Sequence, residues 1–187
     1  MKRMLCLAGL VCSAAVLVLA PAAAAGNVTC QGVLSGTVAG NVIVPKGAEC
    51  ALEFADVSGN VTAQIDATVS VLGSTIGGNY TCNNCQQAHL ESSTINGNYQ
   101  ISHEKQYSVI TNSTIEGNLQ INDSRTDLVL FFIDTNEIGG NLSFNNNEGL
   151  ALITDNTIAG NLTCQNNDPA PVSVGNTAKS MKGQCAP

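Results

Sequence analysis

The apolar residues of the chain recur at fixed distances from the dipeptide Gly-Asn. Between Gly40 and Asn161 this dipeptide occurs seven times, at spacings of 19, 19, 19, 20, 23 and 20 residues. The positions seven and two residues before the glycine, and two and four residues after it, are apolar in all seven repeats. In the third repeat they are Val71, Ile76, Tyr80 and Cys82. Self-similarity at a fixed period of this length indicates a repeat architecture.

Within each repeat the apolar positions lie two apart along short runs, which is the alternation of a β-strand. We therefore expect an all-β, single-domain parallel β-helix (β-solenoid) of about seven coils of 19–23 residues. Each inward side chain would stack on the same position of the next coil. At an inter-strand spacing of about 4.8 Å the rod would be roughly 34 Å long. The columns break the six-residue rule of left-handed hexapeptide helices, which favours a right-handed coil.

The Gly-Asn column has a structural interpretation. Glycine suits a corner that needs a positive φ or a close approach of the next coil. Asparagine tolerates left-handed geometry, can bond its own backbone, and forms an amide ladder when it stacks on itself. Glycan attachment is the alternative, since Asn60, Asn79, Asn141 and Asn161 each begin an Asn-x-Ser/Thr sequon. The regular recurrence of the corner favours the structural role.

Residues 1–25 have the pattern of a secretory signal peptide. Lys2 and Arg3 supply a basic start, Leu5 to Ala20 form an apolar run, and small residues end at Ala25. The run is short for a transmembrane helix, and the rest of the chain has no other candidate. We predict a secreted or cell-envelope solenoid domain of residues 26–187, with an N-terminal cap at about 26–36 and a C-terminal cap at about 165–187.

The charge of residues 26–187 excludes one class of function. They contain five basic side chains against 14 acidic ones, which gives a formal charge of −9. A nucleic-acid-binding protein needs a basic footprint, so we expect no nucleic-acid partner. Only 11% of the chain is charged and 4% is aromatic, which fits strands and turns better than helices.

Six of the eight cysteines lie in the predicted exported domain, where disulfides are expected. Cys30 and Cys50 are 20 residues apart, and Cys164 and Cys185 are 21 apart, close to one coil. Stacked residues on neighbouring coils have Cα atoms within disulfide range. The coil spacing thus favours Cys30–Cys50 and Cys164–Cys185, which leaves Cys82 with Cys85. In this alignment Cys30 lies one residue out of phase with Cys50.

Two other chemistries for the central cysteines receive little support. Cys82, Cys85, His89 and His103 are ligand types that zinc accepts, and Cys82-Asn-Asn-Cys85 has the spacing of a redox motif. However, Cys82 occupies an inward column, the expected compartment is oxidising, and no βαβ pattern surrounds the motif. We predict no metal site, no cofactor and no catalytic residue.

With these motifs in place, the chain resembles small exported bacterial repeat proteins of the right-handed β-helix type. The resemblance extends from Cys30 to Cys185 and is most specific at the ends. Its motifs are the segment from Gly40 to Cys50, the Ile-x-Gly-Asn-Leu coils, the segment from Gly160 to Pro169, and the segment from Lys182 to Cys185. The resemblance implies fold and export but no established activity. Cys82 and Cys85 depart from it.

These features favour an exported non-catalytic structural, adhesive or binding module. The alternative is a polysaccharide-active β-helix lyase or hydrolase, because pectate-lyase-like enzymes use this fold. The longest variable turn, residues 122–130, offers the only acidic cluster with an arginine, formed by Asp123, Arg125 and Asp127. A third hypothesis is ice binding. It would use a threonine column that Asp56 and Glu137 interrupt: Thr37, Thr75, Thr94, Thr114 and Thr157.

The outward positions eight and ten residues before each glycine change character along the chain. In the first coils they are polar or small, and in the later coils they are apolar. The apolar ones are Tyr107, Val109, Leu130, Phe132, Leu150 and Leu152. A monomer rarely leaves such an array bare. We expect a surface for self-association or for a protein or glycan partner, with a hydrophobic ligand as a further alternative. The alternatives are a loop or the tail after Cys164 that covers it, or a register slip that buries part of it.

Overall fold

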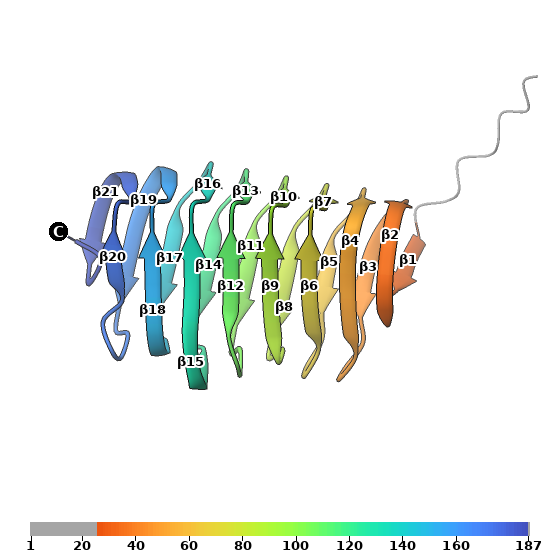
Figure 1. The fold of residues 1–187 in the computed structure, drawn as a ribbon, viewed down its shortest axis with the longest axis horizontal. Coiled ribbons are helices and arrows are strands. Elements are labelled where there is room, and N and C mark those ends of the chain that lie inside the picture. Colours follow the sequence, from red (N-terminus) through yellow and green to blue (C-terminus); the bar gives the residue numbers. More distant parts are fainter. Residues whose placement is uncertain (1–25, 187) are drawn as a thin grey trace, which may run out of the picture.

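The computed structural model describes residues 26–186, except for the side chains of residues 126–129, as one rod of stacked coils (Figure 1). These residues form 21 strands and no helix, and all of the strands belong to one parallel sheet that winds around the rod. The N-terminal strands lie at one end of the rod and the C-terminal strands at the other. The predicted all-β parallel solenoid is confirmed. Its right-handed sense stays a prediction.

The strands stack in three columns, which form the faces of the rod. The first face, at the front of Figure 1, consists of β2 (Gly32–Val38), β4 (Glu49–Val57), β6 (Thr68–Leu72), β9 (Gln87–Glu91), β12 (Ser108–Thr111), β15 (Arg125–Asp134), β18 (Glu148–Thr154) and β20 (Val172–Val174). The second face contains β7 (Thr75–Ile76), β10 (Thr94–Ile95), β13 (Thr114–Ile115) and β16 (Glu137–Ile138). The third face consists of β1 (Gly26–Thr29), β3 (Gly40–Val44), β5 (Val61–Ala63), β8 (Tyr80–Asn83), β11 (Tyr99–Ser102), β14 (Leu119–Asn122), β17 (Leu142–Asn145), β19 (Thr157–Gln165) and β21 (Thr177–Gly183).

The rod has about eight turns rather than seven, because the terminal segments also form coils. Eight strands stack on the first face, from β2 to β20. The two predicted caps contain strands that continue this stack, β1 and β2 at one end and β20 and β21 at the other. Gly26-Asn27 stacks on Gly40-Asn41, a repeat that a fixed period misses because it is only 14 residues away.

The four predicted inward columns form the core, with one exception. Every member other than Val33 is 5% exposed or less. Val33 is 68% exposed, because it lies opposite the outward Ala51 and an irregularity follows it between Leu34 and Gly36. Leu34 takes the inward place, opposite Leu52. The prediction for Val33 is therefore wrong by one residue, which in a strand moves a side chain to the other face.

The Gly-Asn corner forms the predicted amide ladder, but its partners lie on the next coil. The backbone N–H and the Nδ2 of Asn60 both donate to Oδ1 of Asn41, at 2.9 and 3.1 Å. The same pattern continues to Asn161. A Cβ on Gly97 would lie 2.5 Å from Oδ1 of Asn79, whereas φ at Gly97 is not positive. Close approach of the preceding coil, rather than positive φ, is therefore the reason for glycine in this column, except at Gly40, where φ is 110° and the Cβ would also meet Gly26.

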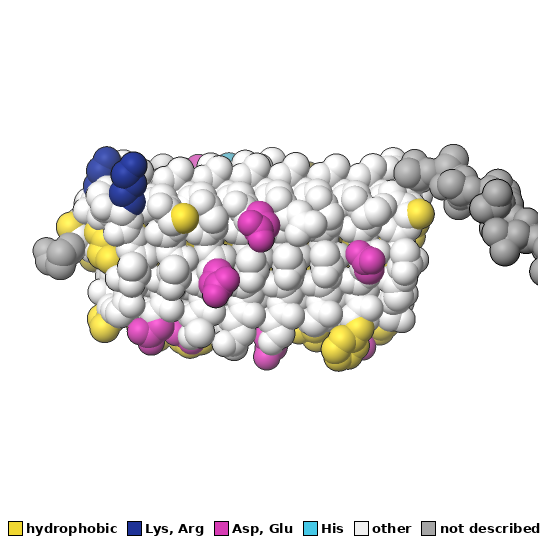
Figure 2. Space-filling view, turned by 90° about the horizontal axis from the view of Figure 1, so that it is seen from above, with side chains coloured by type: hydrophobic (Ala, Val, Ile, Leu, Met, Phe, Trp, Pro, Cys, Tyr) yellow, Lys and Arg dark blue, Asp and Glu magenta, His cyan; other side chains and the backbone are white. Residues whose placement is uncertain are grey.

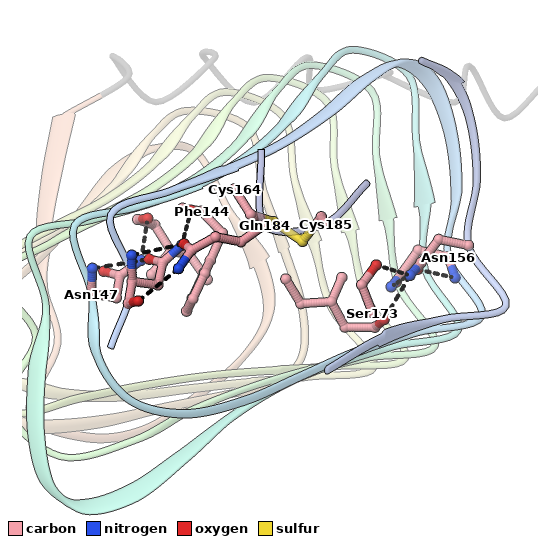
Figure 3. Close-up of a disulfide and its surroundings, with 11 residues drawn as sticks. Phe144, Asn147, Asn156, Cys164, Ser173, Gln184 and Cys185 are labelled. Atoms are coloured by element: carbon pink, nitrogen blue, oxygen red, sulfur yellow. Dashed lines mark hydrogen bonds between the residues drawn. A yellow bond between two sulfur atoms is a disulfide. The ribbon is translucent and has the colours of Figure 1, made fainter. Parts of the chain in front are cut away.

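Two further polar ladders lie inside the other two corners, and the sequence analysis missed them. At these corners a residue with positive φ turns the chain, and in the coils that hold a polar residue next, its side chain points inward to bond the neighbouring coil. One ladder contains Ser74, Ser93, Ser113, Asn136 and Asn156, and the other contains Glu104, Ser124, Asn147 and Asn167. Figure 3 shows the C-terminal parts of both ladders on either side of the core. The first ladder has a sequence signal, a Ser or Asn four residues before the glycine in the last five of the seven repeats.

Three disulfides join the predicted pairs. They are Cys30–Cys50, Cys82–Cys85 and Cys164–Cys185, with Cα separations of 5.6, 5.7 and 5.3 Å. At the two ends the geometric reason differs from simple stacking. Gly32 lies opposite Cys50 and Gly183 lies opposite Cys164, so each bonded partner is two residues from the stacked position. Both glycines have positive φ, which turns the chain so that Cys30 and Cys185 reach the core.

Candidate functional site

The strongest candidate site is a strip of apolar side chains on the outer side of the first face. Val109, Phe132 and Leu152 lie opposite one another on β12, β15 and β18, and Leu130 lies opposite Leu150. Val172 on β20 extends the first row by one coil. The apolar strip is defined as Tyr107, Val109, Leu130, Phe132, Leu150, Leu152 and Val172. The structure thus places five of the six residues predicted from the sequence in one array and adds Val172, while Tyr107 directly precedes β12.

The apolar strip is open to solvent. Tyr107, Leu130, Leu150 and Val172 are 40%, 37%, 54% and 52% exposed, and the other three members are partly exposed because they lie beside these four. The segment after Cys164 forms β20 and β21, which lengthen the rod instead of folding over the strip. The irregular register of β15 lies between Arg125 and Leu130, before the strip begins. Among the described side chains, neither the tail nor a register slip therefore hides the strip.

In the variable turn of residues 122–130, predicted as a second candidate site, the described polar side chains bond to the neighbouring coil. Asp123 occupies a corner with φ 54°, and its Oδ1 accepts a hydrogen bond from Nδ2 of Asn146 on the next coil at 3.1 Å. Nε of Arg125 lies 3.4 Å from Oε1 of Glu148. The side chain of Asp127 lies outside the described residues. Asp123 and Arg125 thus bond to different neighbours, although both line a shallow hollow of about 490 Å³.

That hollow adjoins a buried acid that the sequence analysis did not single out. Glu104 is 1% exposed, and its carboxylate accepts hydrogen bonds from the backbone N–H of Ala88, at 2.7 Å, and from Oγ of Ser108. Burial raises the pKa of Glu104 to about 7, although both hydrogen bonds act in the opposite direction. Glu104 is among the residues that line the hollow, but its carboxylate is bonded to the buried Ala88 and Ser108.

Two tyrosines belong to the same polar region of the core. The rings of Tyr80 and Tyr99 stack with centroids 4.4 Å apart, and both hydroxyls are buried without a hydrogen-bond partner. Burial raises the pKa of both hydroxyls, and the nearby Glu104 carboxylate adds to the effect. In other coils the same column holds Leu119 and Leu142. This region is therefore the main departure from an apolar core among the described residues.

The remaining predicted residues serve the coil. Cys82 and Cys85 are joined to each other, His89 lies on an outward row 3.5 Å from Glu91, and His103 occupies a corner. The described residues, 26–186, contain no group of three or more His, Cys, Asp or Glu side chains that could hold a metal ion. The threonine column is in register on the second face, with Asp56 and Glu137 as interruptions. Figure 2 looks down on the rod and shows only scattered acidic side chains, with Lys and Arg gathered near the C-terminal end.

The described residues contain no helix that is long and apolar enough to span a membrane. The fold and the strip together define a disulfide-bonded β-solenoid with an uncovered apolar surface. No family model, curated protein or solved structure matches the chain. The function must therefore be argued from the geometry itself.

Proposed function

We propose that the protein is an exported, non-catalytic binding module of the cell envelope or extracellular space, with a structural or adhesive role. It holds a protein or glycan partner on the apolar strip. The observation that carries this proposal is the exposure of four large apolar side chains in one array, at 37% to 54%. Contiguous apolar surface of this kind marks interaction sites in soluble proteins.

The composition of the strip fits a contact surface. Tyr107 and Phe132 supply aromatic side chains, which are enriched where binding energy concentrates. The strip lies on paired strands, so its side chains hold fixed spacings before a partner arrives. A preformed surface loses little conformational entropy on binding.

Export is supported by two separate features. Residues 1–25 have the basic start, apolar run and small-residue end of a signal peptide. Three disulfides in a chain of this size are typical of oxidising compartments. The resemblance to exported bacterial repeat proteins supports the same conclusion. N-terminal sequencing of the protein from the culture medium or periplasm of a bacterial host should begin at Gly26, and a chain that stays inside the cell with Met1 intact would contradict export.

The binding role is tested with a matched pair of substitutions on one row. Phe132→Asp places a charge in the strip, and His89→Asp places the same charge on the polar half of the same face. Immobilised wild-type protein and both variants are exposed to the same cell-envelope and host extracts. A partner of the strip should bind the wild type and His89→Asp but not Phe132→Asp. Circular dichroism checks that all three proteins fold. Equal capture by all three, or unfolding of Phe132→Asp, would overturn the assignment.

A further inference from the structure

The two ends of the rod are protected differently against pairing with another chain. At the C-terminal end, Pro169 and Pro171 precede β20, and β21 carries Lys179 and Lys182. After β21 the chain turns inward, so that Cys185 reaches the core beside Cys164 and is 2% exposed (Figure 3). Proline, lysine and covering segments are the usual means by which natural proteins block the edge of a sheet.

The N-terminal end lacks these devices. Among the described residues β1 pairs only with β3 and β2 only with β4, so each strand has a free edge. Residues 26–38 contain no charged residue and no proline, and the first charged side chain after residue 25 is Lys46. Val33 is 68% exposed and Leu34 is partly exposed. β2 bends around a corner of the coil at Gly36, where φ is 72°, so that its first half lies on the first face and Thr37 and Val38 lie on the second. An uncharged strand with a free edge of this kind is a template for a further strand.

We propose that β2 pairs with β2 of a second copy of this chain, antiparallel about a two-fold axis at the N-terminal end. A two-fold axis reverses the strand direction, so the pairing is antiparallel and every contact occurs twice. With the axis at Ser35, the midpoint of β2, Val33 lies opposite Thr37 of the second copy. Leu34 lies opposite Gly36 of the second copy.

The charge distribution favours a second copy as the occupant of this edge. Residues 26–187 carry a formal charge of −9, so two copies repel each other over most of their surface. The N-terminal coil of this acidic rod carries no charged side chain, only the α-amino group of Gly26 once residues 1–25 are removed, so two copies can meet there without bringing carboxylates together. The acids of the next coil, Glu49, Glu53 and Asp56, would remain about 14 Å from their counterparts, beyond the screening length of physiological salt.

The proposed dimer has a consequence for binding. Because β2 passes from the first face to the second at Gly36, antiparallel pairing continues the first face of one copy into the second face of the other. The dimer is therefore a rod of double length that carries two apolar strips, one on each half. Two strips on one molecule allow a partner with repeated sites to be held at both, which raises the overall affinity without a new contact. This consequence rests on the proposed function, and the free N-terminal end rests on removal of residues 1–25.

The test uses residues 26–187, since the described residues 26–186 already contain every coil of the rod. Sedimentation velocity over a wide range of concentration should show a reversible monomer–dimer equilibrium. Val33→Lys should weaken dimerisation more than about tenfold, because a charge is placed on the pairing edge. Val174→Lys is the matched control, as Val174 is 61% exposed on the same face at the opposite end. It should leave dimerisation unchanged, and both variants should melt like the wild type.

A cross-linking variant tests the register. Residues at the centre of an antiparallel pair have Cα atoms about 5 Å apart, within disulfide range, so Ser35→Cys should give a covalent dimer under mild oxidation. A protein that is monomeric at every concentration would overturn the proposal. So would species that grow beyond a dimer, equal effects of Val33→Lys and Val174→Lys, or a Ser35→Cys dimer without the covalent link. A failure of export alone would leave these results unchanged, which separates the two proposals.

Discussion

The two halves of the first face have the same interior and different exteriors. Val71 and Leu90 in the N-terminal half are fully buried, as are Ile133 and Ile153 in the C-terminal half. One residue before each, the outward positions hold Ser70 and His89 in the N-terminal half, and Phe132 and Leu152 in the C-terminal half. The strands of both halves pair in parallel and in register. The coil therefore tolerates either kind of outward side chain, and the apolar strip is not needed to form it.

This contrast between interior and exterior separates the residues that stabilise the rod from the outward residues that are free to serve in binding. The buried columns stay apolar and the Gly-Asn corner recurs in both halves, because each coil must stack on the next. The outward rows meet solvent, so stacking places no such demand on them. Substitutions at shared positions should therefore have equal effects in both halves, and substitutions on the outward rows should not.

The largest effect is expected at the glycine corner. A Cβ on Gly78 would lie 2.4 Å from Oδ1 of Asn60, and a Cβ on Gly140 would lie 2.5 Å from Oδ1 of Asn118. Gly78→Val and Gly140→Val should each lower the free energy of unfolding by about 4 kcal/mol, since backbone must move to admit the side chain. Urea denaturation measures the free energy of unfolding of both variants. A loss in only one half would show that the corners are not equivalent.

Glu104, which has no acidic counterpart in the other described coils, should make the free energy of unfolding depend on pH. Its pKa is about 7 in the folded protein and 4.5 for the ordinary side chain. The folded state therefore holds the proton more tightly, and its stability falls as pH rises from 4.5 to 7. The loss is complete above pH 7, where it reaches about 3 kcal/mol. Glu104→Gln should remove this dependence, so the variant gains about 3 kcal/mol relative to the wild type between pH 4 and pH 8.

The measurement is urea denaturation of the wild type and Glu104→Gln at both pH values. Glutamine keeps an oxygen that can accept the N–H of Ala88, so the shape of the site is retained. A stability difference that is the same at both pH values would contradict a buried carboxylate with a raised pKa.

The asparagine ladder should contribute less, and equally in both halves. Oδ1 of Asn118 accepts the backbone N–H of Asn141 at 2.8 Å, and Oδ1 of Asn79 accepts the backbone N–H of Asn98 at 2.8 Å. Asn118→Ala and Asn79→Ala should each cost about 2 kcal/mol, because an N–H loses its acceptor. Thermal melting compares the two variants. Unchanged melting temperatures would show that water satisfies the freed N–H groups as well as the ladder does. As a control, Asn118→Ala should still bind the partner of the strip.

The smallest effect on stability, and the largest difference in binding, is expected on the outward row. Phe132→Asp and His89→Asp should each change the free energy of unfolding by no more than about 1 kcal/mol, since both side chains are partly exposed. Only Phe132→Asp should abolish binding to the partner of the strip. A large loss of stability in Phe132→Asp alone would mean that the strip is part of the core.

The repeat made much of the architecture predictable, and its failures are local. The columns of Val71, Ile76 and Tyr80 are correct because inward and outward positions alternate along every strand. Val33 was assigned to the core because its distance from Gly40 matches the repeat, but the first coil is irregular there. The disulfide pairs follow from coil spacing, whereas their offset from simple stacking depends on turns at Gly32 and Gly183.

The sequence by itself determined the period, the inward columns, the cysteine pairs and the outward direction of the apolar strip. These depend on alternation within a strand and on repetition between coils, both of which are written in residue order. Only the tertiary structure decided that Glu104 is buried, that Val172 extends the strip, and that glycine is required by the asparagine of the preceding coil. Each of these is a contact between coils whose turns differ in length, so the opposing residue is known only once the coils are stacked.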